Sequence, residues 1–137
     1  MRVLVDTNII LDFLLEREPF LKSTEAFFER IVTGQIMGYV SASSVTDIFY
    51  ITERQTRDID KAQRAIALIL KLFQICPVDY TTLSTAYNSG LPDFEDAVQV
   101  ACAIAQQLDA IVTRNAKDFP VATVPVLNVN QILERLE

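Results

Sequence analysis

The sequence predicts an α/β protein, a three-layer α/β/α sandwich around a central, mainly parallel sheet of about five strands. The main observation is that short, apolar, strand-like segments alternate with longer amphipathic, helix-like segments along the chain. The length of 137 residues suits one domain with a core of its own, and the sequence contains no repeat, linker or low-complexity segment. We therefore expect residues 1–137 to form a single domain.

The first part of the chain is predicted to form two strands and four helices. A buried strand leads to a helix that Asn8 can cap, because apolar residues recur after it at helical spacing. Pro19 restarts the chain before the second helix, and Gly34 and Gly38 separate that helix from the next strand. The expected strands are 1–5 and 37–41, and the expected helices start at residue 8, span 24–33, run from 43 or 44 to about 54, and span 58–73.

The second part is predicted to add three strands and three helices. One helix is expected to stop at Gly90, and Pro92 is expected to open the next one. That next helix is almost wholly apolar, so it should be buried. The expected strands are 74–78, 110–113 and 124–127, and the expected helices are 80–88, 92–108 and 130–136.

The composition is that of an ordinary soluble globular protein, with 50% hydrophobic and 22% charged residues. The formal net charge of −6 argues against a broad electrostatic grip on nucleic acid. It does not exclude an enzyme that acts on nucleic acid, because bound metal ions locally reverse the sign of an acidic site. Net charge therefore decides little about function here.

The sequence contains no recognisable signal for export or membrane insertion. The N-terminus runs directly into a strand, without the basic, apolar and small-residue regions of a signal peptide. Charged residues interrupt the apolar runs well before the roughly 18 residues that a membrane span needs. Cys76 and Cys102 lie in apolar segments and are interpreted as reduced core thiols. We expect a cytoplasmic protein without membrane contact.

The residue types that are absent narrow the possible chemistry. The chain has no histidine, which excludes Ser-His-Asp and Cys-His mechanisms and a histidine-ligated zinc site. Its three glycines fit neither a P-loop nor a dinucleotide-binding fingerprint. Carboxylates are abundant, so catalysis is expected to use a metal ion bound by oxygen atoms.

Asp6 directly follows the first apolar strand and precedes Thr7 and Asn8. A turn or capping aspartate is the simple alternative, because aspartates are common at such positions. Asn8 suits the capping role, however, which leaves Asp6 free to project from the end of the strand. Ligands bind α/β proteins beyond the carboxyl ends of parallel strands, so Asp6 is the first candidate site residue.

Asp47 lies within an expected helix that is apolar after its first turn. An ionised carboxylate that faces the core must be paired, hydrogen-bonded or metal-bound, because burying it alone is costly. The alternative is a solvent-exposed residue beside Arg54, one or two turns further along the helix. Asp47 is the second candidate.

Three acidic residues, Asp93, Glu95 and Asp96, crowd the start of the long apolar helix. The helix dipole favours acidic residues in a first turn, and Asp93 with Asp96 resembles a capping box. One cap does not require three carboxylates, however. The buried helix behind them fixes this turn firmly, as a metal ligand requires, so Asp96 is the third candidate.

Asp118 follows the predicted strand 110–113 and, taken alone, is an ordinary loop aspartate. Its segment also offers Thr113 and Asn115 as neutral oxygen donors. Arg114 and Lys117 in the same segment are candidates for holding a phosphate, because their charged side chains suit phosphate oxygens. Asp118 is the fourth candidate.

The four candidates are more persuasive together than singly. Their positions, where strands end or helices begin, share one edge of a parallel sheet. Carboxylates that converge there repel one another unless a cation joins them, and Mg²⁺ or Mn²⁺ suits carboxylates plus water. Such an ion can activate a water and stabilise charge that builds on a phosphate. The predicted catalytic residues are Asp6, Asp47, Asp96 and Asp118.

Four segments of the sequence, residues 3–8, 44–48, 93–97 and 111–119, resemble motifs of the PIN domain family, and specifically of VapC-like toxins of toxin–antitoxin pairs. The resemblance covers essentially the whole chain. It implies a Mg²⁺- or Mn²⁺-dependent endoribonuclease with RNA as substrate, a cognate antitoxin protein as partner, and a homodimer. It also implies that Asp6, Asp96 and Asp118 are metal ligands, supported by Asn8 and Thr113.

The chain departs from the family pattern at two positions. The second acidic residue is commonly glutamate, and Asp47 is one methylene shorter, which leaves direct and water-mediated metal contact as alternatives. Many members have aspartate where this chain has Asn115, which leaves open whether Asp118 is the fourth ligand or a near neighbour. Asp93 and Glu95 are further candidates for the same site. One or two metal ions are both compatible with this set.

Two functions from other classes compete with the nuclease. A catalytically silent binding module would keep the fold, but the intact acidic set counts against it. A phosphoryl-handling receiver domain or haloacid-dehalogenase-like phosphatase fits poorly, because the phosphatase needs Asp-x-Asp where this chain has Asp6-Thr7-Asn8. The metal-dependent ribonuclease is the leading hypothesis.

Overall fold

The computed structural model describes residues 1–119 and 123–137 and confirms the predicted α/β architecture. In this part of the chain, five strands form one sheet in the order β3-β2-β1-β4-β5, and each neighbouring pair is parallel. The strands are β1 (Arg2–Val5), β2 (Met37–Ser41), β3 (Gln74–Cys76), β4 (Ala110–Val112) and β5 (Val126–Leu127). All five lie within predicted strands; β2 has the predicted bounds and the other four strands are shorter than expected.

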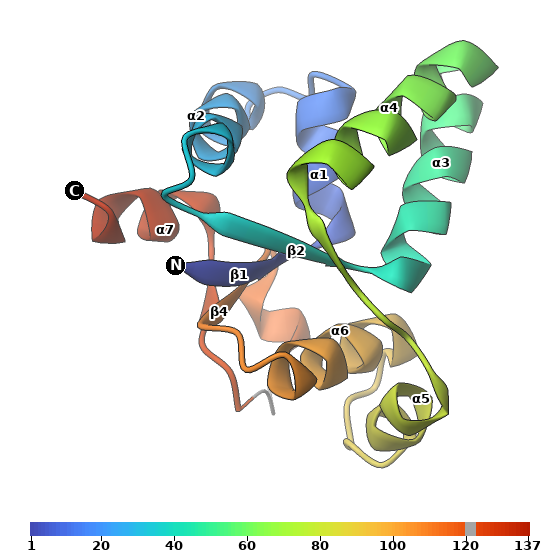
Figure 1. The fold of residues 1–137 in the computed structure, drawn as a ribbon, viewed down its shortest axis with the longest axis vertical. Coiled ribbons are helices and arrows are strands. Elements are labelled where there is room, and N and C mark those ends of the chain that lie inside the picture. Colours follow the sequence, from blue (N-terminus) through green and yellow to red (C-terminus); the bar gives the residue numbers. More distant parts are fainter. Residues whose placement is uncertain (120–122) are drawn as a thin grey trace.

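Helices cover both faces of the sheet and produce the three expected layers (Figure 1). One face packs against α1 to α4 and α7, and the other face packs against α5 and α6. The bounds are α1 (Thr7–Leu14), α2 (Leu21–Val32), α3 (Ala42–Thr56), α4 (Ile59–Leu72), α5 (Tyr80–Tyr87), α6 (Phe94–Ala105) and α7 (Val129–Arg135).

The alternation of side chains along β1 divides the core into two parts. Val3 and Val5 belong to the apolar cluster on the α1 side of the sheet, whereas Leu4 belongs to the cluster on the α6 side. All three side chains are buried. Because both faces of the sheet are covered, successive residues of this central strand are apolar.

The predicted helix cap at Asn8 is wrong. α1 begins at Thr7, and Asp6 occupies the N-cap position, although its side chain makes no capping hydrogen bond. Asn8 therefore lies inside the first turn of the helix. The carboxylate of Asp6 is free for other contacts, as expected, but without any capping role for Asn8.

The helix that contains Asp96 starts later and ends earlier than predicted. α6 begins at Phe94 rather than Pro92, because Asp93 is the N-cap residue and accepts a hydrogen bond from the backbone N–H of Asp96 at 3.0 Å. Beyond the end of the helix, Gln107 adopts a φ of 54°, in the left-handed region, which ends the helical path. Asp93 thus has the capping position that the sequence predicted.

Smaller shifts affect other elements. α3 begins at Ala42, because Ser41 is its N-cap residue and accepts a hydrogen bond from the backbone N–H of Ser44 at 3.2 Å. α2 also begins earlier than predicted, at Leu21. A short 3₁₀ helix over Ala116–Asp118 follows β4, where the sequence analysis expected a loop.

The thiol prediction is confirmed, because Cys76 and Cys102 are both buried and not disulfide-bonded. None of the helices in residues 1–119 and 123–137 combines the length and the apolar character that a bilayer crossing requires.

Candidate active site

The structure brings all four predicted catalytic aspartates to one hollow beyond the carboxyl end of β1. We call this hollow, of about 470 Å³, the acidic pocket. Asp93 and Glu95 line it as well, and so do Asn8 and Arg54. Its carboxylate-bearing residues are Asp6, Asp47, Asp93, Glu95, Asp96 and Asp118. Residues from four separated segments of the chain therefore meet at the edge of the sheet where α/β proteins bind ligands.

Asp6 lies at the base of the pocket, and its side chain is held by two neutral donors. The residue is 8% exposed. The amide Nε2 of Gln99 donates to its Oδ1 at 3.1 Å, and the hydroxyl of Thr113 donates to its Oδ2 at 2.7 Å. These contacts fix the orientation of the carboxylate but leave its charge uncompensated.

The contact from Thr113 agrees with its predicted supporting position, whereas Gln99 was missed by the sequence analysis. Gln99 is almost fully buried in α6, among apolar neighbours on either side. A polar residue inside such an apolar run must find a partner, because an unpaired buried amide is costly. That isolated amide was the signal available in the sequence.

Two carboxyl groups of the acidic pocket, those of Asp96 and Glu95, have raised pKa values. Burial, followed by the negative charges around it, raises the pKa of Asp96 from 3.8 to about 7. Those charges belong to Asp93, Asp6, Asp118 and Glu95. The pKa of Glu95 is raised too, first by burial and then by Asp47, Asp6 and Asp93. Arg54 is the only basic residue in the described lining, so most of the negative charge of the pocket has no opposite charge beside it.

The residues of the acidic pocket fit a hard divalent cation. They supply oxygen donors, and a cation would offset the repulsion that adds to the effect of burial on the pKa of Asp96. Thr7 also lines the pocket, and its buried hydroxyl makes no hydrogen bond of good geometry. Within residues 1–119 and 123–137, no three acidic side chains are arranged so that they could hold an ion together. Mg²⁺ does not require three, because it keeps several waters and takes one or two carboxylates directly.

Not every predicted neighbour reaches the pocket. Asn115 and Lys117 do not line it, although the backbone N–H of Asn115 donates to the Thr113 hydroxyl at 3.2 Å. Lys117 is exposed in the 3₁₀ helix that ends at Asp118. Asn115 is thus joined to the site through Thr113, and Lys117 lies outside the pocket.

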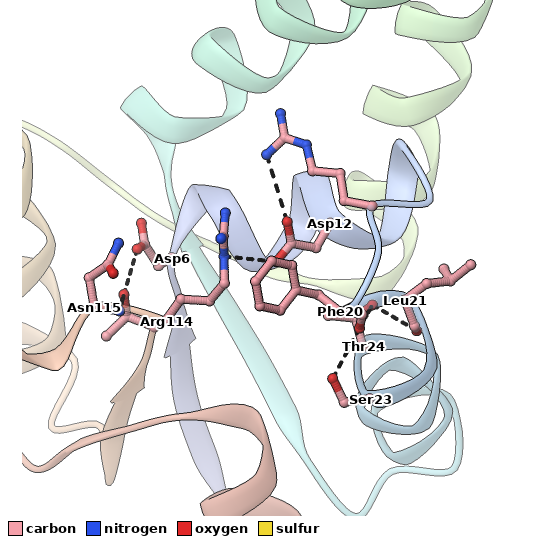
Figure 2. Close-up of polar contacts among 10 residues, drawn as sticks. Asp6, Asp12, Phe20, Leu21, Ser23, Thr24, Arg114 and Asn115 are labelled. Atoms are coloured by element: carbon pink, nitrogen blue, oxygen red, sulfur yellow. Dashed lines mark hydrogen bonds and ion pairs between the residues drawn. The ribbon is translucent and has the colours of Figure 1, made fainter.

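The structure does not support the predicted phosphate contact of Arg114, because this side chain is engaged elsewhere. Its Nε lies 3.0 Å from Oδ2 of Asp12, and its guanidinium lies 4.2 Å from the ring centre of Phe20 (Figure 2). Asp12 is completely buried and also faces Arg17, with 3.7 Å between Nη1 and Oδ1. The pair ties the segment after β4 to α1.

Asp12 was also missed by the sequence analysis. It stands between Leu11 and Phe13 on the first helix, where a carboxylate in an apolar stretch was the available signal. Burial raises its pKa, and the charges of Arg114 and Arg17 oppose that rise. This second buried acid is neutralised by the protein itself.

The fold and the acidic edge of the sheet define a class of protein, and the sequence comparison names it. The profile of the family described as PIN domain matches residues 2–117. The chain therefore belongs to the PIN domain family. No curated protein matches the sequence significantly.

Solved structures with the same fold include toxin–antitoxin proteins. The chain is similar to VapBC2 from Rickettsia felis bound to a promoter DNA fragment, with 15% identity, a TM-score of 0.73, and coverage of 93% of this chain and 98% of the other. VapBC-1 from nontypeable Haemophilus influenzae gives 17% identity, a TM-score of 0.69, and coverage of 95% and 99%. VapC20 from Mycobacterium tuberculosis, described as a sarcin–ricin-loop-cleaving toxin, gives 14% identity, a TM-score of 0.63, and coverage of 80% of this chain and 86% of the other.

Proposed function

We propose that this protein is a Mg²⁺- or Mn²⁺-dependent endoribonuclease and the toxin of a toxin–antitoxin pair. The observation that carries the proposal is the acidic pocket, in which six residues with carboxylates converge at the ligand-binding edge of a PIN fold with a single base among the described lining residues. Such a concentration of negative charge suits catalysis by a divalent cation on a phosphodiester.

In the proposed site, Asp6, Asp96 and Asp118 would hold the metal, and Asp47 would contact it directly or through a water. The ion would supply an activated water and stabilise negative charge on the phosphate. Gln99 and Thr113 would keep the two oxygens of Asp6 in place, so that its orientation is set before the metal arrives. Near neutral pH and without a cation, the carboxyl group of Asp96 would be partly protonated and partly ionised, because its pKa is raised to about 7.

The proposed partners rest on resemblance and on the similar structures. VapC20 is described as cleaving the sarcin–ricin loop, which supports RNA as the substrate class. The VapBC structures support a cognate antitoxin protein. A homodimer that works in the cytoplasm is part of the same proposal.

The test is an RNA cleavage assay on the purified protein with Mg²⁺, with Mn²⁺, and with EDTA. We expect cleavage with either ion and none with EDTA. Asp6→Asn and Asp96→Asn should each abolish cleavage while the protein stays folded by circular dichroism. The matched control is Asp60→Asn, which removes one exposed carboxylate from the first turn of α4 and should cleave as the wild type does.

Two results would contradict the proposal. Cleavage that persists in EDTA would reject the metal-dependent mechanism. Full cleavage by Asp96→Asn would reject the assignment of the site. If the wild type cleaves no RNA and calorimetry detects no Mn²⁺ binding, a catalytically silent PIN module becomes the better description.

A further inference from the structure

A second hollow adjoins the acidic pocket along α3. It is lined by Tyr50, Glu53, Arg54, Arg57 and Ile59, at the junction of α3 and α4. Tyr50 and Arg54 line both hollows, so the two are direct neighbours. We call this second hollow the α3 groove.

One face of α3 connects the two hollows. Asp47, Tyr50 and Arg54 follow one another at intervals of three and four residues, which places them along a single stripe of the helix, and Arg57 follows three residues later, just beyond the end of α3. Asp47 lies in the acidic pocket, and Arg57 is the C-cap residue at the far end of α3. At 1.5 Å per residue, these two residues lie about 15 Å apart along the helix.

The basic side chains of this stripe make no ion pair with the residues that the structure describes. Both ion pairs found in residues 1–119 and 123–137 involve Asp12, so neither Arg54 nor Arg57 is paired in the described part of the chain. Tyr50 is 60% exposed. Glu53 lines the groove as well, and it offsets one of the two positive charges.

We propose that the α3 groove binds single-stranded RNA next to the reacting phosphodiester, with Arg54 and Arg57 holding phosphates and Tyr50 stacking on a base. The inference rests on the proposed nuclease function, since the acidic pocket supplies the reacting end of the strand. The guanidinium fork of arginine matches phosphate oxygens, and aromatic rings are the usual platforms for unpaired bases.

The charge distribution favours RNA over a protein segment. A chain of net charge −6 needs a local group of cations to hold a polyanion, and Arg54 is the base that borders the acidic pocket in the described structure. Arg114 is engaged with Asp12 and does not serve this purpose. The groove shares Tyr50 and Arg54 with the acidic pocket, so a strand whose phosphodiester lies at the carboxylates can continue into it.

The test measures the affinity of the full chain for a fluorescein-labelled oligouridine by fluorescence anisotropy. EDTA is present, so that no cleavage occurs, and the salt concentration is varied. We expect Arg54→Gln to raise Kd about tenfold and to reduce the salt slope by about 0.7, the value for one phosphate contact with a single strand. Tyr50→Leu should raise Kd about fivefold or more and leave the salt slope unchanged, because stacking is not ionic.

The matched control is Lys71→Gln, which removes the same charge from the exposed last turn of α4. Lys71 lies about 18 Å along α4 from Ile59, at 1.5 Å per residue, and should not affect Kd. If Arg54→Gln binds the oligouridine with the same Kd and salt slope as the wild type, the proposal is overturned. A wild type that does not bind the oligouridine overturns it too, and a protein segment would then be the better occupant.

Failure of this inference is distinguishable from failure of the nuclease proposal. Cleavage by the wild type together with unchanged binding by Arg54→Gln and Tyr50→Leu rejects the α3 groove alone. Weakened binding by both variants together with no cleavage in any metal supports the groove and rejects the nuclease.

Discussion

Two buried aspartates at the two ends of α1 show how differently the protein treats negative charge. Asp6 precedes the helix and is 8% exposed, whereas Asp12 lies within it and is 0% exposed. Asp6 accepts hydrogen bonds from the neutral groups of Gln99 and Thr113. Asp12 faces the guanidinium groups of Arg114 and Arg17. The charge of Asp12 is thus balanced by cations of the chain itself, and that of Asp6 is not.

The pKa values of Asp12 and Asp96 are both raised by burial, but the charges around the two residues have opposite signs. Burial raises the pKa of Asp12, and two arginines oppose the rise. Burial raises the pKa of Asp96 beside Asp6, and four more carboxylates add to the rise. A buried acid therefore does not by itself identify a cation site. The sign of the charges around it does.

The largest expected effect is on protein stability and concerns Asp12, whose charge is balanced by two arginines. Asp12→Ala should lower the free energy of unfolding by about 3 kcal/mol, because it leaves a cavity at a fully buried position and removes the acidic partner of both Arg114 and Arg17. Urea unfolding followed by circular dichroism measures this loss. Asp60→Ala, at an exposed position of α4, is the control and should change stability by about 0.5 kcal/mol or less.

A double variant sharpens the same prediction. Asp12→Leu with Arg114→Leu should be more stable than Asp12→Leu alone, because the single variant leaves Arg114 without its partner, whereas the double variant replaces both members of the pair by apolar groups. Equal stability of the single variant Asp12→Ala and the wild type would show that the ion pair contributes nothing to stability. The statement that the protein stabilises the charge of Asp12 would then be wrong.

The next effect concerns metal binding in the acidic pocket. Mn²⁺ at a hundred times its Kd should stabilise the wild type by about 2.7 kcal/mol, because it binds the folded state only. Asp96→Asn should lose this stabilisation, whereas Asp12→Asn should keep it. Thermal unfolding with and without Mn²⁺ measures both. A loss of the Mn²⁺ effect in both variants would mean that Asp12, like Asp96, is needed for metal binding.

The sequence was sufficient to predict the features that depend on local pattern. The strands and the position of Asp6 follow from apolar segments that end at a polar residue, and the shared edge follows from parallel topology. The meeting of Asp47 and Asp118 at one hollow was predictable for the same reason.

Contacts between distant segments were not predictable in this way. Arg114 was expected to meet a phosphate because its segment follows a strand, but its partner, Asp12, is supplied by a helix at the other end of the chain. The role of Gln99 depends on α6 lying beneath β1, which only the packing determines. Arg54 was considered only as a neighbour of Asp47, since the pattern within one helix does not reveal the hollow beside it.

A smaller effect is expected from the groups that hold Asp6. Gln99→Met keeps the shape of the side chain but removes the donor to Asp6, and it should weaken Mn²⁺ binding about tenfold, as is usual for residues behind a metal ligand. Isothermal calorimetry measures the change. Gln63→Met, exposed on α4, is the control. An unchanged Mn²⁺ affinity in Gln99→Met would show that Asp6 is oriented by Thr113 alone.

The smallest effect is the pH dependence of stability without metal. The pKa of Asp96 is raised from 3.8 to about 7, so between these values the folded protein holds a proton that the unfolded chain has lost. The free energy of unfolding should therefore fall as pH rises from about 4 to about 7. Because the pocket is open to solvent and salt screens its charges, we expect a change of at most about 1 kcal/mol.

The difference between wild type and Asp96→Asn isolates this effect, because Asp12 and Glu95, whose pKa values are also raised, are present in both proteins. Unfolding in EDTA at several pH values should show a steeper decline for the wild type than for the variant. Saturating Mn²⁺ should abolish the decline, since a bound cation favours the ionised carboxylate and competes with the proton. Parallel pH profiles for the two proteins would mean that Asp96 is not under the repulsion inferred for the acidic pocket, and that the contrast between Asp6 and Asp12 does not extend to their neighbours.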